Sequence, residues 1–159
     1  MQLKATIDSS VLIALGKLGY LNLIGQILDK LVVPESVLAE IKEDLVYGEV
    51  NKLIGAGLVE VAKGSNRELL NMLSSNLGKG ESETIVLSIE LGADVALLDD
   101  LRARKTARRL KVQVMGTLAI LKTLTDLKLI NEKPENLCAK LIHQGFWIDA
   151  ESCLKVLKA

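Results

Sequence analysis

Residues 91–100 (LGADVALLDD) constrain the fold more than any other stretch of the chain. The glycine is typical of a helix end, and the apolar run from Val95 to Leu98 has the length of a buried strand. Two carboxylates, Asp99 and Asp100, then end the run. Buried parallel sheets bind their ligands beyond the carboxyl ends of the strands. We therefore expect Asp99 and Asp100 to lie at a functional edge of such a sheet.

The start of the chain repeats this pattern. Leu3 to Ile7 is predicted to be a short strand, Asp8 ends it, and a helical pattern begins at Val11. If the two strands are neighbours in a parallel sheet, Asp8 faces the same crevice as Asp99. The alternative is that Asp8 only caps the following helix, and the spacing favours neither interpretation. One acid of the 99–100 pair could also be a cap, but capping does not require two adjacent like charges.

The rest of the chain alternates short strands with helices. Further strands are predicted over 31–33, 58–62 and 112–115. Helices are predicted from 11, over 21–28, from Pro34 through an apolar stripe that ends at Leu45, over 49–54, 68–73, 81–92, 102–110 and 116–127, from 134, and over 152–157. This alternation predicts one α/β domain over residues 1–159, with a short twisted parallel sheet and helices on both faces.

Composition excludes several classes of protein. The 20 basic and 20 acidic residues cancel, so no global field attracts nucleic acid. The single histidine, His143, lies far from the acids and argues against Ser-His-Asp or Cys-His catalysis. Aromatic residues are scarce, and Trp147 beside Phe146 is expected to be a packing anchor or a dimer contact rather than a base-stacking platform.

Cysteine usage and hydropathy indicate the cellular compartment in which the protein is expected to work. Cys138 and Cys153 are 15 positions apart and belong to no CxxC motif, so we expect two free thiols in a reducing compartment. The first residues do not resemble a signal peptide, and no window of 18 residues is apolar enough to span a membrane. These features predict a cytoplasmic protein that does not associate with a membrane.

Three more acids complete the candidate site. Glu40 lies at the rim of an apolar helical stripe, while Glu81 and Glu83 occupy a first helical turn, where the helix dipole favours acids. Helical periodicity places Glu81 closer than Glu83 to the face formed by Ile85 and Ile89. Each of these acids, taken alone, occupies a position that is common for acids in helices. Carboxylates without Cys or His partners are the ligands that Mg²⁺ or Mn²⁺ prefers.

The ordered set of acids resembles the PIN-domain ribonucleases, particularly the toxin-like branch of toxin–antitoxin pairs. The matching segments are 5–12 (ATIDSSVL), 33–40 (VPESVLAE), 80–85 (GESETI), 97–104 (LLDDLRAR) and 114–117 (VMGT). Carried over by position, the family's four acids correspond to Asp8, Glu40, Glu81 and Asp99.

The chain departs from the family pattern at two of these positions. The third acid is usually Asp, and here Glu83 competes with Glu81; the fourth is doubled, so Asp100 competes with Asp99. Glu83 and Asp100 are therefore kept as second choices. The hydroxyls of Ser10 and Thr117 are candidates for holding a carboxylate or a metal-bound water, with ordinary capping as the alternative.

The resemblance implies an endoribonuclease that uses Mg²⁺ or Mn²⁺, an RNA substrate, a homodimer and an inhibitory antitoxin partner. One alternative is a PIN-like domain that binds RNA or a partner without catalysis. Another is a Mg²⁺-binding receiver domain, which places its acidic pair after the first strand rather than after a late one.

One dense basic cluster follows the second acid pair. It comprises Arg102, Arg104, Lys105, Arg108, Arg109 and Lys111. A solvated helix face is one interpretation of such a run. Because the run begins directly beyond the proposed metal site, the other is that Arg102, Arg104, Arg108 and Arg109 contact RNA phosphates.

Overall fold

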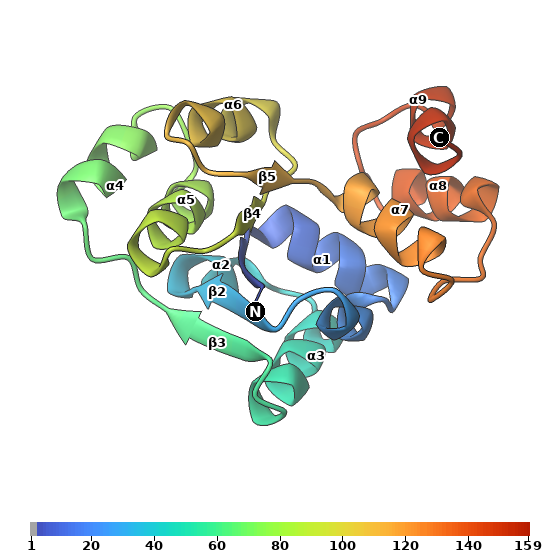
Figure 1. Cartoon of the computed structure of the whole chain (residues 1–159), viewed down its shortest axis with the longest axis horizontal. Coiled ribbons are helices and arrows are strands. Elements are labelled where there is room, and N and C mark those ends of the chain that lie inside the picture. Colours follow the sequence, from blue (N-terminus) through green and yellow to red (C-terminus); the bar gives the residue numbers. More distant parts are fainter. Residues whose placement is uncertain (1–2) are drawn as a thin grey trace.

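A computed structural model describes residues 3–159 of the chain. Five parallel strands pair in the order β3-β2-β1-β4-β5 (Figure 1). They are β1 (Lys4–Ile7), β2 (Lys30–Pro34), β3 (Val59–Ala62), β4 (Val95–Leu97) and β5 (Val114–Met115). The predicted α/β fold with a parallel sheet is confirmed, and the five strands lie where the alternating pattern predicted them, with ends shifted by one or two residues.

Helices cover both faces of this sheet. They are α1 (Ser9–Leu18), the 3₁₀ helix η1 (Leu21–Gln26), α2 (Glu35–Glu40), α3 (Asp44–Gly55), α4 (Arg67–Ser74), α5 (Lys79–Leu91), α6 (Leu101–Arg109), α7 (Thr117–Asp126), α8 (Pro134–His143) and α9 (Ala150–Leu157). Figure 1 shows α4, α5 and α6 grouped at one side of the molecule and α7, α8 and α9 at the other.

Alternation of side chains along the strands divides the apolar residues into two cores. Leu97 packs into the larger core with α1, α3 and the C-terminal helices, while its neighbours Ala96 and Leu98 pack into a second core with α4, α5 and α6. Since successive strand residues point to opposite faces, one short strand contributes to both cores. This explains why Val95 to Leu98 is apolar without alternation.

The sheet order places the first and fourth strands side by side. Ile7 lies opposite Leu97, and the Asp8 amide donates a 3.0 Å hydrogen bond to the Leu97 carbonyl. Strand order reverses between β1 and β4, and ligands of open α/β sheets bind at such a switch point. Because a receiver domain has the order 2-1-3-4-5, this topology contradicts the receiver alternative.

Several predicted helix boundaries are shifted, and two of these differences concern the helices that carry Glu40 and Glu81. The helix expected from Pro34 through Leu45 is interrupted, because Ile41 has extended backbone angles and α3 starts only at Asp44. As a result Leu45 is 84% exposed instead of lying on a buried stripe. The helix expected to start at Glu81 begins two residues earlier, directly after Gly78.

The expectation of two free thiols is also wrong. Cys138 on α8 and Cys153 on α9 are both buried and form a disulfide, with their Cα atoms 5.9 Å apart. This separation is within the range that a disulfide spans. The bond joins the two C-terminal helices, and the inference from free thiols to a reducing compartment does not hold.

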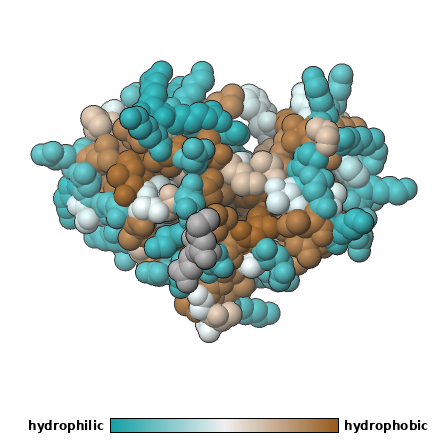
Figure 2. Space-filling model, viewed as in Figure 1, coloured by the Kyte–Doolittle hydropathy of each residue, from teal (hydrophilic) through white to brown (hydrophobic). Residues whose placement is uncertain are grey.

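The hydropathy of the surface differs between these groups of helices and the region between them. Figure 2 shows hydrophilic side chains over α6 and over the C-terminal helices, with a more apolar surface between them. Within residues 3–159, none of the helices has the length and apolar character needed to cross a membrane.

Candidate functional site

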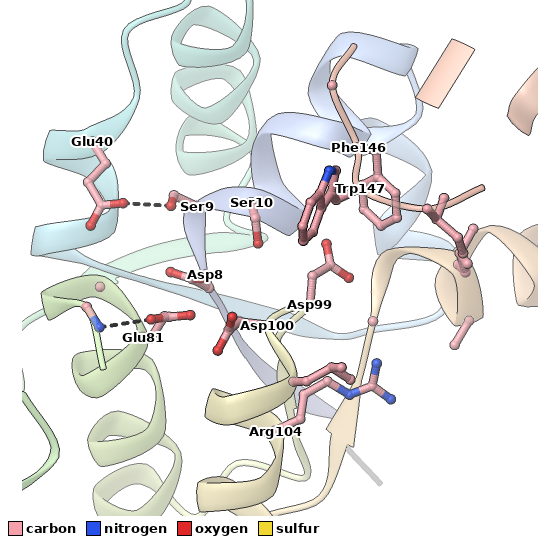
Figure 3. Close-up of a pocket in the computed structure, with 18 of the residues that line it drawn as sticks. Asp8, Ser9, Ser10, Glu40, Glu81, Asp99, Asp100, Arg104, Phe146 and Trp147 are labelled. Atoms are coloured by element: carbon pink, nitrogen blue, oxygen red, sulfur yellow. Dashed lines mark hydrogen bonds between the residues drawn. The ribbon is translucent and has the colours of Figure 1, made fainter. Parts of the chain in front are cut away.

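A cavity of about 890 Å³ opens at the carboxyl ends of β1 and β4 (Figure 3). Five of the acids singled out from the sequence line it, and they come from four separate segments of the chain. They are Asp8, Glu40, Glu81, Asp99 and Asp100. The fold therefore brings all four preferred acids, and one of the two second choices, to a single cavity.

Asp8 is the most buried of these acids. Its side chain is only 4% exposed, it does not cap α1, and its Oδ1 atom is buried without a hydrogen-bond partner. Burial raises the pKa of Asp8 to about 7, the Ser9 amide opposes this rise, and the charges of Glu81, Glu40 and Asp99 add to it. Since buried polar atoms are normally hydrogen-bonded, the free oxygen indicates a site built for a ligand. The structure does not support the capping interpretation of Asp8.

Glu40 approaches Asp8 across the first turn of α5. Its Oε2 accepts a 2.7 Å hydrogen bond from the Ser9 hydroxyl. A Cβ atom added to Gly80 would lie 2.6 Å from Glu40 Oε1 and 3.1 Å from Asp8 Oδ1. Gly80 therefore leaves the space in which the two carboxylates meet. Sequence reasoning missed Ser9 and Gly80; the glycine directly before Glu81 was the available signal.

Glu81 lies at the third position of α5, not at the first. Its Oε1 accepts a 2.9 Å hydrogen bond from the Gly78 amide, so the side chain caps the N-terminus of the helix. Burial raises the pKa of Glu81, with Asp100 and Glu40 contributing, while the Gly78 hydrogen bond and Arg102 oppose the rise. The helix cap thus holds this carboxylate at the edge of the cavity.

Glu83 points away from the cavity. Its Oε1 accepts from the Ser36 amide at 3.0 Å and the Ser36 hydroxyl at 2.6 Å, and its Oε2 accepts from the Gly64 amide at 3.0 Å. Burial raises the pKa of Glu83, but these three hydrogen bonds outweigh it and the net pKa is lowered. Glu83 therefore connects α5 to the segments that contain Ser36 and Gly64, and it does not lie with the other acids.

The adjacent acids Asp99 and Asp100 have different partners. Asp99 accepts from the Thr117 amide at 2.8 Å and the Thr117 hydroxyl at 2.6 Å, at the start of α7. Burial raises the pKa of Asp99, whereas the Thr117 hydrogen bonds and the charge of Arg104 lower it. Asp100 instead caps α6 through the Ala103 amide at 2.9 Å. Both predicted hydroxyl positions are at the site: Thr117 holds a carboxylate, and Ser10 lines the cavity.

The four arginines of the basic cluster do not act as one surface. Arg104 lines the cavity, and its Nε is buried without a hydrogen-bond partner. Arg102 donates a 3.4 Å hydrogen bond to the Asn76 carbonyl, while Arg108 and Arg109 are exposed in the last turn of α6. Of the four, only Arg104 lines the cavity, although the charge of Arg102 also acts on Glu81.

Beside Asp99, the wall of the cavity is apolar (Figure 3). It comes from the segment between α8 and α9 and includes Phe146 and Trp147. Phe146 packs against the larger core, but Trp147 has an exposed fraction of 101%. Trp147 is therefore not the packing anchor that we expected, and the sequence contained no signal for its position at the cavity.

Comparison with known proteins connects this geometry to a family. The sequence model of the DUF3368 family, described as a PIN domain, matches residues 4–159. The chain belongs to the PIN-domain family. PIN domains are generally nucleases and typically use divalent metal ions. A search of curated proteins gives no match.

Two solved structures resemble this PIN domain. PAE2754 from Pyrobaculum aerophilum has a TM-score of 0.54 and 14% sequence identity, and the match covers 79% of this chain and 99% of that protein. The PilT N-terminus domain protein SSO1118 from the hyperthermophilic archaeon Sulfolobus solfataricus P2 has a TM-score of 0.43 and 20% identity, with 72% and 87% covered. At such identities, the similarity to PAE2754 supports the fold alone.

The cavity fits a hard divalent cation by the chemistry of its donors. All of its acidic side chains supply oxygen ligands, and Asp8 Oδ1 is buried and unpartnered. As the side chains are placed, no group of three His, Cys, Asp or Glu residues within residues 3–159 is arranged to hold a metal ion. The hydrogen bonds of Glu40 to Ser9 and of Glu81 to Gly78 hold these carboxylates apart.

Proposed function

We propose that this PIN domain is a metal-dependent endoribonuclease that hydrolyses RNA phosphodiester bonds. The observation that carries the proposal is the buried, unpartnered oxygen of Asp8 in a cavity that it shares with Glu40, Glu81 and Asp99. Like charges at short range are unfavourable unless a cation compensates them. Burial raises the pKa values of Asp8, Glu81 and Asp99, and the charges of neighbouring acids add to the rise at Asp8 and Glu81.

One or two Mg²⁺ or Mn²⁺ ions would be held by Asp8, Glu40, Glu81 and Asp99, with Asp100 as a second choice. When bound, such an ion supplies charge neutralisation at the phosphate and lowers the pKa of a water. Carboxylates bind metal ions in their ionised form, so Asp8 has to release its proton before it can bind the ion. With a pKa near 7, Asp8 makes metal affinity rise steeply up to neutral pH.

Two residues orient the fourth acid and the substrate. The amide and hydroxyl of Thr117 hold both oxygens of Asp99, which fixes the direction of that carboxylate. Arg104 lines the same cavity and its charge acts on Asp99, so its guanidinium can bind a phosphate oxygen beside that acid. These contacts position an RNA phosphate against the acids.

The proposal extends to a toxin-like component of a toxin–antitoxin pair, a homodimer inhibited by a small antitoxin protein. Its support is the resemblance of the five matching segments to that branch of the family. Expression of the chain alone should then arrest growth of a bacterial host, and the Asp8→Asn variant should not. Normal growth on expression of an active enzyme would contradict the toxin role and leave the nuclease standing.

Cleavage of labelled RNA tests the nuclease directly. We expect the purified protein to cut RNA with Mn²⁺ or Mg²⁺, to leave 5′-phosphate ends, and to lose activity in EDTA. Asp8→Asn, purified in parallel, controls for contaminating nucleases and should be inactive. RNA binding without any cleavage under these conditions would instead favour the non-catalytic alternative.

A further inference from the structure

We infer that Trp147 stacks on an unpaired base of the RNA substrate, beside the phosphate that is cleaved. This inference rests on the proposed function and concerns the apolar wall of the same cavity. Trp147 lies at a cavity that five carboxylates and Arg104 also line, and its ring is fully exposed. In Figure 3, Asp99 lies between Trp147 and Arg104.

The exposure of Trp147 is imposed by its neighbours in the chain. Phe146 and Ile148, one residue to either side, pack against the larger core. The Phe146 amide donates a 2.9 Å hydrogen bond to the Leu141 carbonyl, directly after Gly145, whose φ of +92° allows the chain to turn at the end of α8. With residues 146 and 148 turned inward, the ring between them is directed outward.

The segment is also fastened at both ends. The disulfide between Cys138 and Cys153 joins α8 to α9, the two helices that flank it. The 16 residues from one cysteine to the other therefore form a closed loop that carries Trp147. Because the backbone that carries the ring is fastened, a base can stack on it without the entropic cost of ordering a free loop.

The chemistry of the cavity matches the two halves of a nucleotide. Arg104 and the metal-binding acids suit the phosphate, while the flat face of Trp147 suits a base. Bases in a duplex are already stacked on their neighbours, whereas unpaired bases can turn their faces to an aromatic side chain. The arrangement therefore selects RNA in which the nucleotide beside the cleaved phosphate is unpaired.

A protein contact at Trp147 fits the surface less well. The exposed large aliphatic side chains that line the cavity or the surface beside the ring are Leu101, Ile142 and Val156. An aromatic side chain buries about 150–250 Å², whereas a stable interface buries about 800 Å² on each partner. Asp99, Asp100 and Asp149 also line the adjoining surface, and an apolar partner would have to desolvate them.

Fluorescence tests the inference because Trp147 is the only tryptophan of the chain. The measurement uses the Asp8→Asn variant, in which we expect no cleavage. We expect an unstructured RNA of about twelve nucleotides to quench the emission and to shield the ring from acrylamide. The same sequence in a duplex should do neither at equal concentration. Quenching of equal size by the duplex, or none by the single strand, would overturn the inference.

Substitution gives an independent readout. Trp147→Ala should weaken binding of the single strand by about tenfold or more, Trp147→Phe should restore most of it, and duplex binding should not change. In the active protein the loss should appear mainly in KM. Tyr47→Ala, which removes another exposed ring on α3, is the matched control. Unchanged affinity in Trp147→Ala would overturn the inference.

Two further outcomes separate this inference from the proposed function. If the active protein cleaves RNA and Trp147→Ala cleaves it with the same KM, the inference fails and the nuclease stands. If the protein neither binds nor cleaves RNA, both fail. Sedimentation of the protein and of Trp147→Ala completes the test. A dimer that dissociates in Trp147→Ala would mean that the ring is a subunit contact, which contradicts stacking.

Discussion

Two buried carboxylates beside α5, those of Asp8 and Glu83, differ in how their charge is accommodated. At the cavity, Asp8 has a buried oxygen without a partner and a pKa raised to about 7. Glu83 is buried to a similar extent, but three hydrogen bonds satisfy it and lower its pKa. Asp8 costs the metal-free fold stability, whereas Glu83 stabilises it. Burial alone therefore does not distinguish a functional acid from a structural one; hydrogen-bond satisfaction does.

The largest expected effect is the loss of cleavage in Asp8→Asn. If Asp8 is a metal ligand, this change should lower single-turnover cleavage by at least about a thousandfold, equivalent to roughly 4 kcal/mol of transition-state stabilisation. Glu60→Gln, which alters an exposed acid on β3, serves as the control. Substantial activity in Asp8→Asn would remove Asp8 from the site and with it the basis of the comparison.

The pH dependence of stability should have opposite signs at the two sites. A raised acid pKa means that the folded metal-free protein holds the Asp8 proton more tightly than the unfolded chain does. The free energy of unfolding should therefore fall as pH rises from about 4 to 7, by as much as about 3 kcal/mol, because one pKa unit is worth about 1.4 kcal/mol. Saturating Mn²⁺ should reverse the loss.

Glu83 should behave in the other way, since its lowered pKa contributes stability that is present above pH 4.5 and is lost below it. Denaturant titrations at several pH values in EDTA measure both pH dependences. They compare the parent protein with Asp8→Asn and Glu83→Gln. Asp8→Asn should be the more stable protein at pH 8 without metal. A parent protein as stable as Asp8→Asn at that pH would show that the Asp8 carboxylate is not strained.

Neighbouring substitutions on α5 should separate activity from stability. Glu83→Gln places an amide group against donors, so it should destabilise the fold by about 2 kcal/mol and leave cleavage at low temperature largely intact. Glu81→Gln should reduce cleavage by at least about tenfold, roughly 1.4 kcal/mol, with little loss of stability. Melting curves and single-turnover cleavage of both variants under saturating Mn²⁺ give the comparison. The reverse pattern would make Glu83 the ligand.

The smallest expected effect is that of Gly80→Ala. The added methyl would meet Glu40 Oε1 at 2.6 Å, and because this atom ends a flexible side chain, Glu40 should swing away at little cost in stability. Cleavage should fall severalfold, equivalent to roughly 1 kcal/mol, with a weaker affinity for Mn²⁺. Gly48→Ala, at a helical glycine with open space around it, is the matched control. Equal Mn²⁺ affinity in both variants would show that Glu40 does not bind the ion.

Local patterns were sufficient to predict the acid edge of the sheet. A short apolar strand followed by an acid occurs at Asp8 and again at Asp99, and parallel strands end at the same edge. This is why the sequence predicted that these two side chains share a crevice. The strand-and-helix alternation likewise predicted the α/β class, because it depends on the periodicity of neighbouring residues.

The choice between Glu81 and Glu83 depended on contacts between distant segments, which local sequence patterns do not show. The sequence favours Glu81 over Glu83 by its place on the expected buried side of the helix, by its position at the expected helix start and by the family's spacing to Asp99. Glu81 does line the cavity, yet Glu83 is the acid on the buried side, and Ile89 is 44% exposed. The sequence could not show that Ser36 and Gly64, from two other segments, would supply hydrogen bonds to a buried Glu83.

The sequence by itself determined the order of strands and helices and the acids that follow the strands, since both depend on residues close together in the chain. Only the tertiary structure decided the Cys138–Cys153 disulfide, the free oxygen of Asp8 and the outward ring of Trp147. Each of these depends on which distant segments pack together. Packing decides which polar groups find partners and which remain free to bind a ligand.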